Sequence, residues 1–308
     1  IAIGPCVFLG FMCQDANAGA CKPERTYRMI WKAKDRIFEG TGVIMGVLNV
    51  TPDSFSDGGT HNGYEDALAF AEEMLAQGAD IIDVGGESTR PGSAAPSIQE
   101  ELDRVLPVVC ELVARGVCVS VDTRHWEVAQ ACVKAGVHII NDVSGFRDPK
   151  MREVAAASDC GLVVMHMLGE PGTMQNDPHY DDVVTEVRDY LIAQAQLLEG
   201  MGVAPECICI DPGPGFGKTF EHNQALISAT AELAGCGYPL MVAVSRKSYI
   251  GTAAGIAVPA QRDEDSALCA AAAMHHGALV ARVHDVATSK RMFEKSKRAV
   301  VALGSNMG

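Results

Sequence analysis

The sequence predicts a (β/α)8 barrel, in which eight parallel strands alternate with eight helices. Short runs rich in β-branched residues alternate with longer amphipathic stretches from residue 43 onward, and these runs number eight. The runs begin about 34 residues apart, which leaves room for one crossover helix and two loops between parallel strands. A doubly wound open sheet is the alternative, because periodicity alone does not show closure. The count of eight favours the barrel.

The predicted strands are the apolar runs at residues 43–48, 80–84, 117–121, 137–140, 162–165, 207–210, 240–244 and 279–283. The predicted helices lie between them, at residues 64–77, 97–115, 125–135, 151–158, 181–201, 221–234, 263–276 and 286–298. Residues 26–38 are typical of a β-hairpin, which we expect to cover the N-terminal end of the barrel. One domain over residues 26–298 follows, with a leader at 1–25 and a tail at 299–308.

The composition excludes several classes of protein. The 308 residues are 48% hydrophobic and 21% charged, as in globular proteins rather than disordered ones. A net charge of −14 argues against binding nucleic-acid phosphates, and 6% aromatic residues are too few for a base-stacking surface. The 11 cysteines include no C-x-x-C pair, which favours reduced thiols in a cytoplasmic protein. The apolar stretch 1–13 is too short to span a bilayer, so we expect no membrane association.

Polar side chains follow every predicted strand, at the end where parallel barrels carry their active sites. One such residue alone is more often a helix N-cap or a turn former than a catalyst. Because all eight strands end in this way, we interpret the rim as a binding site. Its residues include Asn49, Glu87, Arg90, Asp122, Asn141, Asp142, Met165, His166, Asp211, Ser245, Lys247, Ser248, Arg282 and His284.

The charges at this rim predict a ligand with two chemically different ends. A local group of cations in an acidic chain suits an anion that must be gripped and released. Carboxylate and amide acceptors suit the amidine-like edge of a pterin or a guanine. The ligand predicted is therefore a flat heterocycle with a phosphorylated end. The cations are Arg90, Lys247, Arg282 and His284, and the acceptors are Asp122, Asn141 and Asp211.

Four other motifs lack the context that their chemistry needs. Residues 212–219 resemble a P-loop, but Pro212 stands where that motif requires glycine. No G-x-G-x-x-G follows a predicted strand, so a dinucleotide fingerprint is missing. Asn49 begins a glycosylation sequon, yet it lies at a barrel mouth in a protein of reduced thiols. The nine histidines show no short zinc-ligand spacing.

Seven ordered motifs resemble those of dihydropteroate synthases. The first is Met-Gly-Val-Leu-Asn-Val-Thr-Pro-Asp-Ser-Phe-Ser-Asp-Gly-Gly at 45–59, and the second is Asp-Val-Gly-Gly-Glu-Ser-Thr-Arg-Pro-Gly at 83–92. The others lie at 120–123, 140–145, 211–213, 245–248 and 282–286. The resemblance covers roughly residues 26–298 and also implies a (β/α)8 barrel.

The resemblance implies condensation of 6-hydroxymethyl-7,8-dihydropterin diphosphate with para-aminobenzoate, which yields dihydropteroate and diphosphate. It also implies Mg²⁺ and a homodimer, and it places the chain in a family that is the target of sulfonamides. The pterin would be bound by Asp122, Asn141, Asp211 and Lys247, with Met165 and Phe216 packed against the rings. Asn49 would bind Mg²⁺ with the diphosphate, which Arg90, Arg282 and His284 would hold. The second substrate would be framed by Thr89, Pro91, Ser248 and Phe55, and Asp57 is expected among the substrate-binding residues. The central catalytic set would be Lys247, Arg282, Asp122 and Asp211.

The sequence departs from this family in three places. Pro214 stands where the family usually has an apolar residue other than proline, and residues 1–25 match nothing recognisable. The tail, Val300–Gly308, resembles the first strand and loop of 6-hydroxymethyl-7,8-dihydropterin pyrophosphokinase, so we expect a natural fusion of the two enzymes. Alternative functions are a pterin-dependent methyltransferase and a non-catalytic pterin-binding barrel.

Overall fold

Eight parallel strands form a closed barrel in the computed structural model, which describes residues 29–51, 60–88 and 96–305. The strands are hydrogen-bonded in the order β8-β7-β6-β5-β4-β3-β10-β9. A parallel bridge between Ile210 and Leu240 joins β8 to the segment that enters β9, and the Ile210 N–H donates to Pro239 O at 2.8 Å. The barrel is therefore confirmed and the open sheet is excluded. The strands are β3 (Val43–Asn49), β4 (Ile81–Gly85), β5 (Val119–Asp122), β6 (Ile139–Asp142), β7 (Gly161–Met165), β8 (Ile208–Asp211), β9 (Met241–Val242) and β10 (Val280–Val283).

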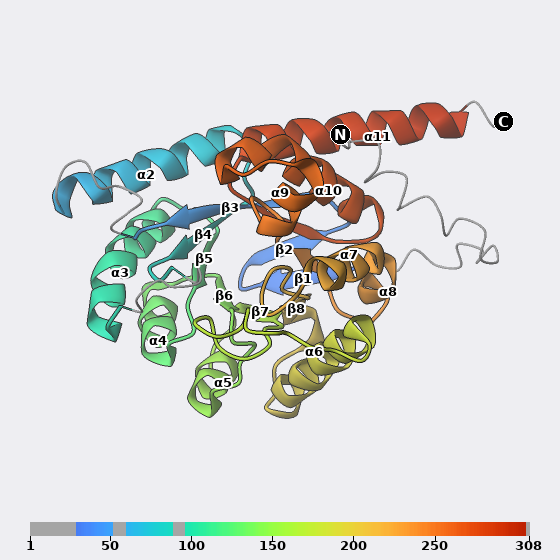
Figure 1. Cartoon of the computed structure of the whole chain (residues 1–308). Coiled ribbons are helices and arrows are strands. Elements are labelled where there is room, and N and C mark those ends of the chain that lie inside the picture. Colours follow the sequence, from blue (N-terminus) through green and yellow to red (C-terminus); the bar gives the residue numbers. More distant parts are fainter. Residues whose placement is uncertain (1–28, 52–59, 89–95, 306–308) are drawn as a thin grey trace.

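Helices surround the outside of this barrel (Figure 1). The predicted helix at 221–234 is two helices, because the chain turns at Ala229, where the Thr230 hydroxyl donates to Ile227 O at 2.6 Å. A short helix after β9, α9, was not among the predicted ones. The helices are α2 (Thr60–Ala76), α3 (Ile98–Ala114), α4 (Trp126–Ala135), α5 (Pro149–Ala156), α6 (Val183–Gly200), α7 (Phe220–Ser228), α8 (Thr230–Ala234), α9 (Ser248–Ala254), α10 (Asp263–His275) and α11 (Val286–Ser305), with 3-10 turns η1 (Pro205–Cys207) and η2 (Pro259–Arg262).

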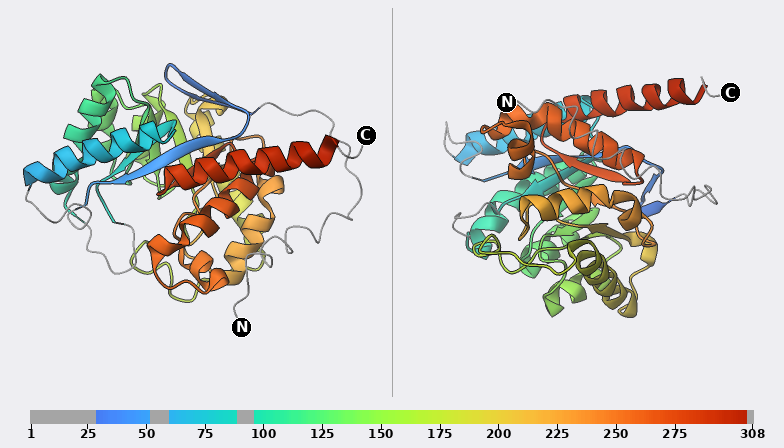
Figure 2. Two further views of the ribbon diagram at one scale, coloured as in Figure 1. Left: turned by 90° about the horizontal axis from the view of Figure 1, so that it is seen from above. Right: turned by 45° about the vertical axis from the view of Figure 1, so that its right-hand side comes forward.

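The last helix corrects one expectation about the tail. Helix α11 continues to Ser305, seven residues beyond the predicted end at 298, so residues 300–305 are helical rather than a strand. No proline interrupts this stretch, and its first glycine is Gly304, so nothing in the local sequence stops the helix earlier. Figure 2 shows α11 as one long rod that extends past the barrel.

The core has two layers because alternate strand residues face opposite sides of the sheet. Outward-facing residues such as Ile44, Ile82 and Ile140 pack against the helices. Inward-facing residues such as Met45 and Ile139, together with the hairpin, fill the half of the barrel at the N-terminal ends of the strands. The half at the C-terminal ends holds the polar rim, so the protein interior changes from apolar to charged along the barrel axis.

A β-hairpin covers the N-terminal end of the barrel, as the sequence predicted. It pairs β1 (Ile30–Ala33) with β2 (Arg36–Glu39) in antiparallel register. Trp31 is fully buried, and its indole Nε1–H donates to Cys207 O at 3.1 Å. Gly161 at the start of β7 allows the hairpin to pack closely against the barrel, because a Cβ at this position would lie 2.9 Å from the Cβ of Ala33 in β1.

Two further findings concern the cysteines and the helices. The eight cysteines that the structure describes form no disulfide with one another. Within the described ranges, no helix is long and apolar enough to cross a membrane.

Replacement of Trp31 should destabilise the whole barrel. We expect Trp31→Ala to lower the free energy of unfolding by about 3–5 kcal/mol, because it opens a cavity and leaves Cys207 O without its donor. Ile37→Ala is the matched control on the same hairpin, since Ile37 is 60% exposed, and should change it by about 0.5 kcal/mol at most. Urea unfolding followed by circular dichroism measures both variants. Similar losses of unfolding free energy in the two would contradict a stabilising role for the buried Trp31 of the hairpin.

Candidate active site at the C-terminal rim of the barrel

Arg282 on β10 is the centre of the ionic contacts at the rim. Its Nε donates to Asp83 Oδ2 at 2.6 Å, and a terminal nitrogen donates to Asp122 Oδ2 at 2.5 Å. Asp83 belongs to β4 and Asp122 to β5, so one guanidinium joins three strands. Burial acts to lower the pKa of Arg282, but the two carboxylates raise it above its usual range. Arg282 therefore keeps its charge in the barrel.

Asp122 and Asn141 lie side by side, because the register of β5 and β6 pairs them directly. Burial raises the pKa of Asp122 to about 7, against the opposing effect of Arg282. The Asn141 amide donates to Asp83 Oδ2 at 3.2 Å, which turns its carbonyl oxygen toward other partners. The structure thus brings together two of the predicted acceptors over a buried carboxylate.

Asp211 ends β8 and is 1% exposed. Its Oδ1 accepts the Gly213 N–H at 2.8 Å, which leaves Oδ2 as an acceptor for a ligand. Burial raises the pKa of Asp211, while that hydrogen bond and the charge of Lys247 oppose the rise. Asp211, like Asp122, is therefore a carboxylate that gains from a hydrogen-bond donor arriving in the barrel mouth.

Lys247 and Phe216 are in contact at the rim. The Lys247 ammonium lies 4.0 Å from the centre of the Phe216 ring, which is a cation–π contact. Burial and the charge of Arg282 lower the pKa of Lys247 to about 8, although Asp211 acts to raise it. Phe216 also packs with Met165 in an apolar cluster at the mouth. The pair Met165 and Phe216 can hold a flat ring whose polar edge faces the carboxylates.

The loop after β9 positions Ser245, Lys247 and Ser248. Arg246, which has a left-handed φ of 60°, is held by Asp263 through bonds of 2.7 and 2.8 Å from its guanidinium. Arg262 donates to Arg246 O at 3.0 Å. Two arginines, one bound to a carboxylate and the other to backbone carbonyls, thus fix the backbone that carries Lys247. Ser248 opens α9 and is exposed.

His284 follows β10 and is tied to the same loop. Its backbone N–H donates to Ser245 Oγ at 3.1 Å, and its Nδ1 lies 3.0 Å from that oxygen. His284 therefore stands beside Arg282 on the strand end while Ser245 fixes the ring orientation. The predicted cations Lys247, Arg282 and His284 all lie at one side of the rim.

Asn49 is half-buried at the end of β3, and it pairs with Gly85 of β4, which has no side chain to fill the space between them. A Cβ at Gly85 would lie 3.7 Å from Asn49 Oδ1 and 3.7 Å from Asp122 Oδ2. The amide oxygen and the carboxylate therefore face the same small space. Oxygen donors of this kind are the ligands that Mg²⁺ prefers.

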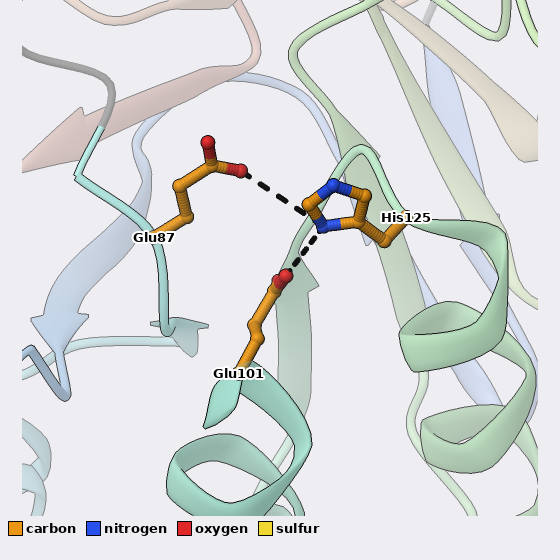
Figure 3. Close-up of side chains that lie close together, drawn as sticks. All are labelled: Glu87, Glu101 and His125. Carbon is orange, nitrogen blue, oxygen red and sulfur yellow. Dashed lines mark hydrogen bonds and ion pairs between the residues drawn. The ribbon is translucent and has the colours of Figure 1, made fainter. Parts of the chain in front are cut away.

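A second group of potential metal ligands, Glu87, Glu101 and His125, lies just outside the barrel mouth (Figure 3). His125 Nδ1 is 2.6 Å from Glu101 Oε2, and this bond raises the pKa of His125. Both oxygens of Glu87 are bound by Arg124, at 2.9 and 3.0 Å. Because that guanidinium already neutralises Glu87, we assign the group to joining the first turn of α3 to the loops after β4 and β5.

Five predicted site residues lie outside the described residues. They are Phe55, Asp57, Thr89, Arg90 and Pro91.

Sequence reasoning missed two residues of the site. Asp83 holds both Arg282 and Asn141, and its signal was a lone charge inside the apolar run Ile81–Val84. Lys218 was considered only within a rejected P-loop, yet it is 4% exposed beneath Phe216. Spacing alone could not have shown its burial.

Two cavities elsewhere contain none of these residues. One of about 260 Å³ adjoins Met29, Pro205 and Pro239 near the hairpin, and one of about 370 Å³ lies between α4 and α5.

Comparison with known proteins gives consistent matches. The family model "Pterin binding enzyme" matches residues 45–284. Dihydropteroate synthase of Escherichia coli K12 is 49% identical over 244 residues, which are 79% of this chain and 86% of that protein. Dihydropteroate synthase of Neisseria meningitidis serogroup C is 45% identical over 286 residues, or 91% and 99% of the two chains.

Solved structures agree with these matches. Xanthomonas albilineans dihydropteroate synthase with 4-aminobenzoic acid has a TM-score of 0.83 at 41% identity and covers 89% of this chain and 99% of its own. The Burkholderia cenocepacia enzyme complexed with 7,8-dihydropteroate has a TM-score of 0.82 at 40% identity, with 90% and 99% covered.

The bridge from Arg282 to Asp83 should show strong energetic coupling. We expect Arg282→Met to lower the free energy of unfolding by about 3 kcal/mol, because it leaves a buried carboxylate without its cation. Adding Asp83→Asn should recover part of this loss, with a coupling energy above about 1.5 kcal/mol in a double-mutant cycle. The exposed pair Lys32–Glu206 is the control and should couple by less than about 1 kcal/mol. Equal coupling in the two cycles would contradict the buried bridge.

Proposed function

Because the chain belongs to the dihydropteroate synthase family, we propose that its rim residues carry out that family's reaction in the following way. The chain is a transferase that condenses 6-hydroxymethyl-7,8-dihydropterin diphosphate with para-aminobenzoate and releases diphosphate and 7,8-dihydropteroate. The observation that carries the assignment of roles is the convergence of Asp122, Asp211, Lys247 and Arg282 on one rim.

The pterin ring would bind between the acceptors and the apolar cluster. Asp211 would accept hydrogen bonds from the amidine-like edge of the ring, and Asp122 and Asn141 would bind its other polar atoms. Phe216 and Met165 would cover the faces of the ring, with Lys247 donating to it from above Phe216. Each donor on the ligand would relieve the desolvation of a buried carboxylate.

The diphosphate would lie on the cationic side of the rim. Arg282 and His284 would hold its oxygens, together with Arg90. Arg282 already spends two donors on Asp83 and Asp122, so three of its five N–H groups remain for the anion. This geometry suits a leaving group, because the diphosphate would be held by ion pairs and hydrogen bonds and would form no covalent bond to the protein.

Carbon–nitrogen bond formation needs no nucleophile from the protein. Diphosphate departs from a methylene group attached to the electron-rich dihydropterin, which can share the positive charge that develops. The amine of para-aminobenzoate then bonds to that carbon and loses a proton. The residues described here would stabilise the departing anion, hold the ring and exclude water.

The donors present fit Mg²⁺ bound together with diphosphate. Mg²⁺ commonly takes one or two protein oxygens and fills its other positions with water and substrate phosphate. Asn49 Oδ1, facing the same space as the Asp122 carboxylate, would be such a ligand. When bound, Mg²⁺ would neutralise charge on the leaving diphosphate.

Para-aminobenzoate would bind on the outer side of the mouth. Its carboxylate would be held by Ser248 and by the first N–H groups of α9, where Lys247 provides no side-chain cap. Thr89, Pro91 and Phe55 would frame its ring, and Asp57 would contribute to the substrate site. Sulfonamides would compete for the same place.

Assembly, compartment and the fusion stay proposals. Helix α10 is rich in alanine, and Ala267, Ala270, Ala271 and Ala273 are buried within the chain, while Ala272 is half-buried. That helix lies against α11, and His275 Nε2 is 2.7 Å from Ser296 Oγ. The proposed homodimer rests on the family resemblance. A cytoplasmic location and a following pyrophosphokinase domain rest on the cysteine pattern and on the tail sequence.

Diphosphate release from the two substrates with Mg²⁺ tests the reaction and the pterin site together. Release should require para-aminobenzoate in the wild type, and it should fall by about a hundredfold or more in Lys247→Ala and Asp211→Asn. Both variants should keep the circular dichroism spectrum of the barrel, because both residues lie at its rim. Lys150→Ala is a control on α5, where the ammonium lies 4.7 Å from the centre of the Trp126 ring on the outer helices and meets none of the predicted site residues, and should retain full turnover. Release that ignores para-aminobenzoate would refute the reaction, and near-normal turnover in either rim variant would refute the pterin pocket.

The metal assignment predicts a specific change in Mg²⁺ dependence. Asn49→Ala should raise the Mg²⁺ concentration for half-maximal diphosphate release by about tenfold or more, because it removes an oxygen ligand. Asn49→Asp keeps an oxygen at that position and should need no more Mg²⁺ than the wild type. A titration from metal-free protein measures both, and identical Mg²⁺ dependence in all three proteins would show that Asn49 is not a ligand.

A further inference from the structure

Lys218 is a buried lysine whose ammonium group is bound mainly by backbone. It is 4% exposed and lies at the end of the loop between β8 and α7. Its Nζ donates to Phe216 O at 2.9 Å and to Gly213 O at 3.0 Å. The same nitrogen lies 2.9 Å from His166 Nδ1 and 3.4 Å from His166 O. One side chain thus joins two points of the loop to the end of β7.

No carboxylate among the described residues lies within 4.0 Å of this ammonium. Carbonyl oxygens and an imidazole nitrogen therefore supply all of its close acceptors. The three within 3.0 Å, Phe216 O, Gly213 O and His166 Nδ1, match its three N–H donors, and His166 O lies farther away at 3.4 Å. Burial lowers the pKa of Lys218 to about 7, with Asp211 opposing and Lys247 adding to the decrease. Burial of a lysine without a carboxylate partner is unfavourable, so we expect this side chain to have a structural or functional role.

The loop that Lys218 holds cannot be replaced by regular structure. Gly213, Gly215 and Gly217 all have left-handed φ values, of 60°, 82° and 62°. A Cβ at Gly213 would lie 2.0 Å from His166 O, and one at Gly217 would lie 2.7 Å from Leu168. The loop backbone is therefore pressed against the segment after β7, and its inward carbonyls at 213 and 216 need donors from a side chain.

Residues of the proposed pterin site lie on both sides of these contacts. Asp211 precedes the loop and is bonded to the Gly213 N–H, while Gly213 O is bonded to Lys218. Phe216, whose carbonyl is bonded to Lys218, carries the ring that meets Lys247. Movement of the loop backbone would displace the carboxylate and the ring together.

We propose that Lys218 is a positioning residue for the pterin, whose ammonium holds loop 212–217 against His166 so that Asp211 and Phe216 keep their binding geometry. This inference rests on the pterin site proposed above. It also explains the P-loop-like end of the motif, Gly217-Lys218-Thr219. That lysine points into the protein toward carbonyl oxygens rather than toward a nucleotide phosphate.

Direct binding of 6-hydroxymethylpterin, followed by isothermal calorimetry, tests the role in the whole chain. Lys218→Met should weaken binding by about tenfold or more, because it leaves the loop carbonyls and His166 without donors. Tyr180→Phe is the matched control, since it removes one neutral hydrogen bond from the same loop, to Gly217 O at 2.9 Å, and should weaken binding by less than about threefold. Lys218→Met that binds like Tyr180→Phe, even with a lower melting temperature, would overturn the proposal.

The Asp211→Asn variant separates this inference from the site on which it rests. If Asp211→Asn binds the pterin normally, the proposed pocket itself is wrong. If Asp211→Asn loses binding and Lys218→Met does not, only the role of Lys218 is wrong.

Chemical rescue and a milder pair of variants keep the test decisive if Lys218→Met does not fold. Methylammonium should restore pterin binding to Lys218→Ala, whereas tetramethylammonium, which is charged but has no N–H, should not. His166→Leu removes the acceptor and should bind the pterin several-fold more weakly than His166→Asn, whose amide oxygen can replace Nδ1. Equal binding by the two His166 variants, or equal rescue by the two cations, would overturn the proposal.

Discussion

Charge balance inside the barrel mouth is the constraint on which the rest of the site depends. Three carboxylates, Asp83, Asp122 and Asp211, lie around two cations, Arg282 and Lys247, which offset all but one of their charges, and each member would be costly to bury alone. The strands β4, β5, β8 and β10 that carry most of them are therefore coupled through their side chains as well as through the sheet. The overall charge of −14 has little part in this, since the balance is local.

Two loops at the rim are supported by the same device. Lys218 binds carbonyls of the loop after β8, and Arg262 binds the carbonyls of Arg246, Lys247, Ile256 and Ala257 beside the loop after β9. Each cation supplies several donors to a backbone that has left regular secondary structure. The residues that face the ligand are thus held by buried cations that do not face it.

The strands, the hairpin and the clustering of polar residues at the rim were predictable, because each follows from periodicity and from the direction of parallel strands. Asp83 was missed because its position inside an apolar run says that it needs a partner without naming Arg282 from the far end of the chain. Lys218 was missed because its role follows from its burial among backbone carbonyls, which the sequence does not show. The break at Ala229 and the extension of α11 were missed because propensity sets helix ends only weakly.

The hairpin has a consequence for how the chain is made. Trp31 bonds to Cys207, 176 residues later, and β3 pairs with β10 near the other end of the chain. At ribosomal rates of about 5–20 residues per second, Trp31 must wait roughly 10–35 s for its partner. The indole remains uncovered until then, and one edge of β3 remains uncovered for longer, until β10 has been made. Nascent chains of this protein are therefore expected to engage chaperones until β10 has left the ribosome.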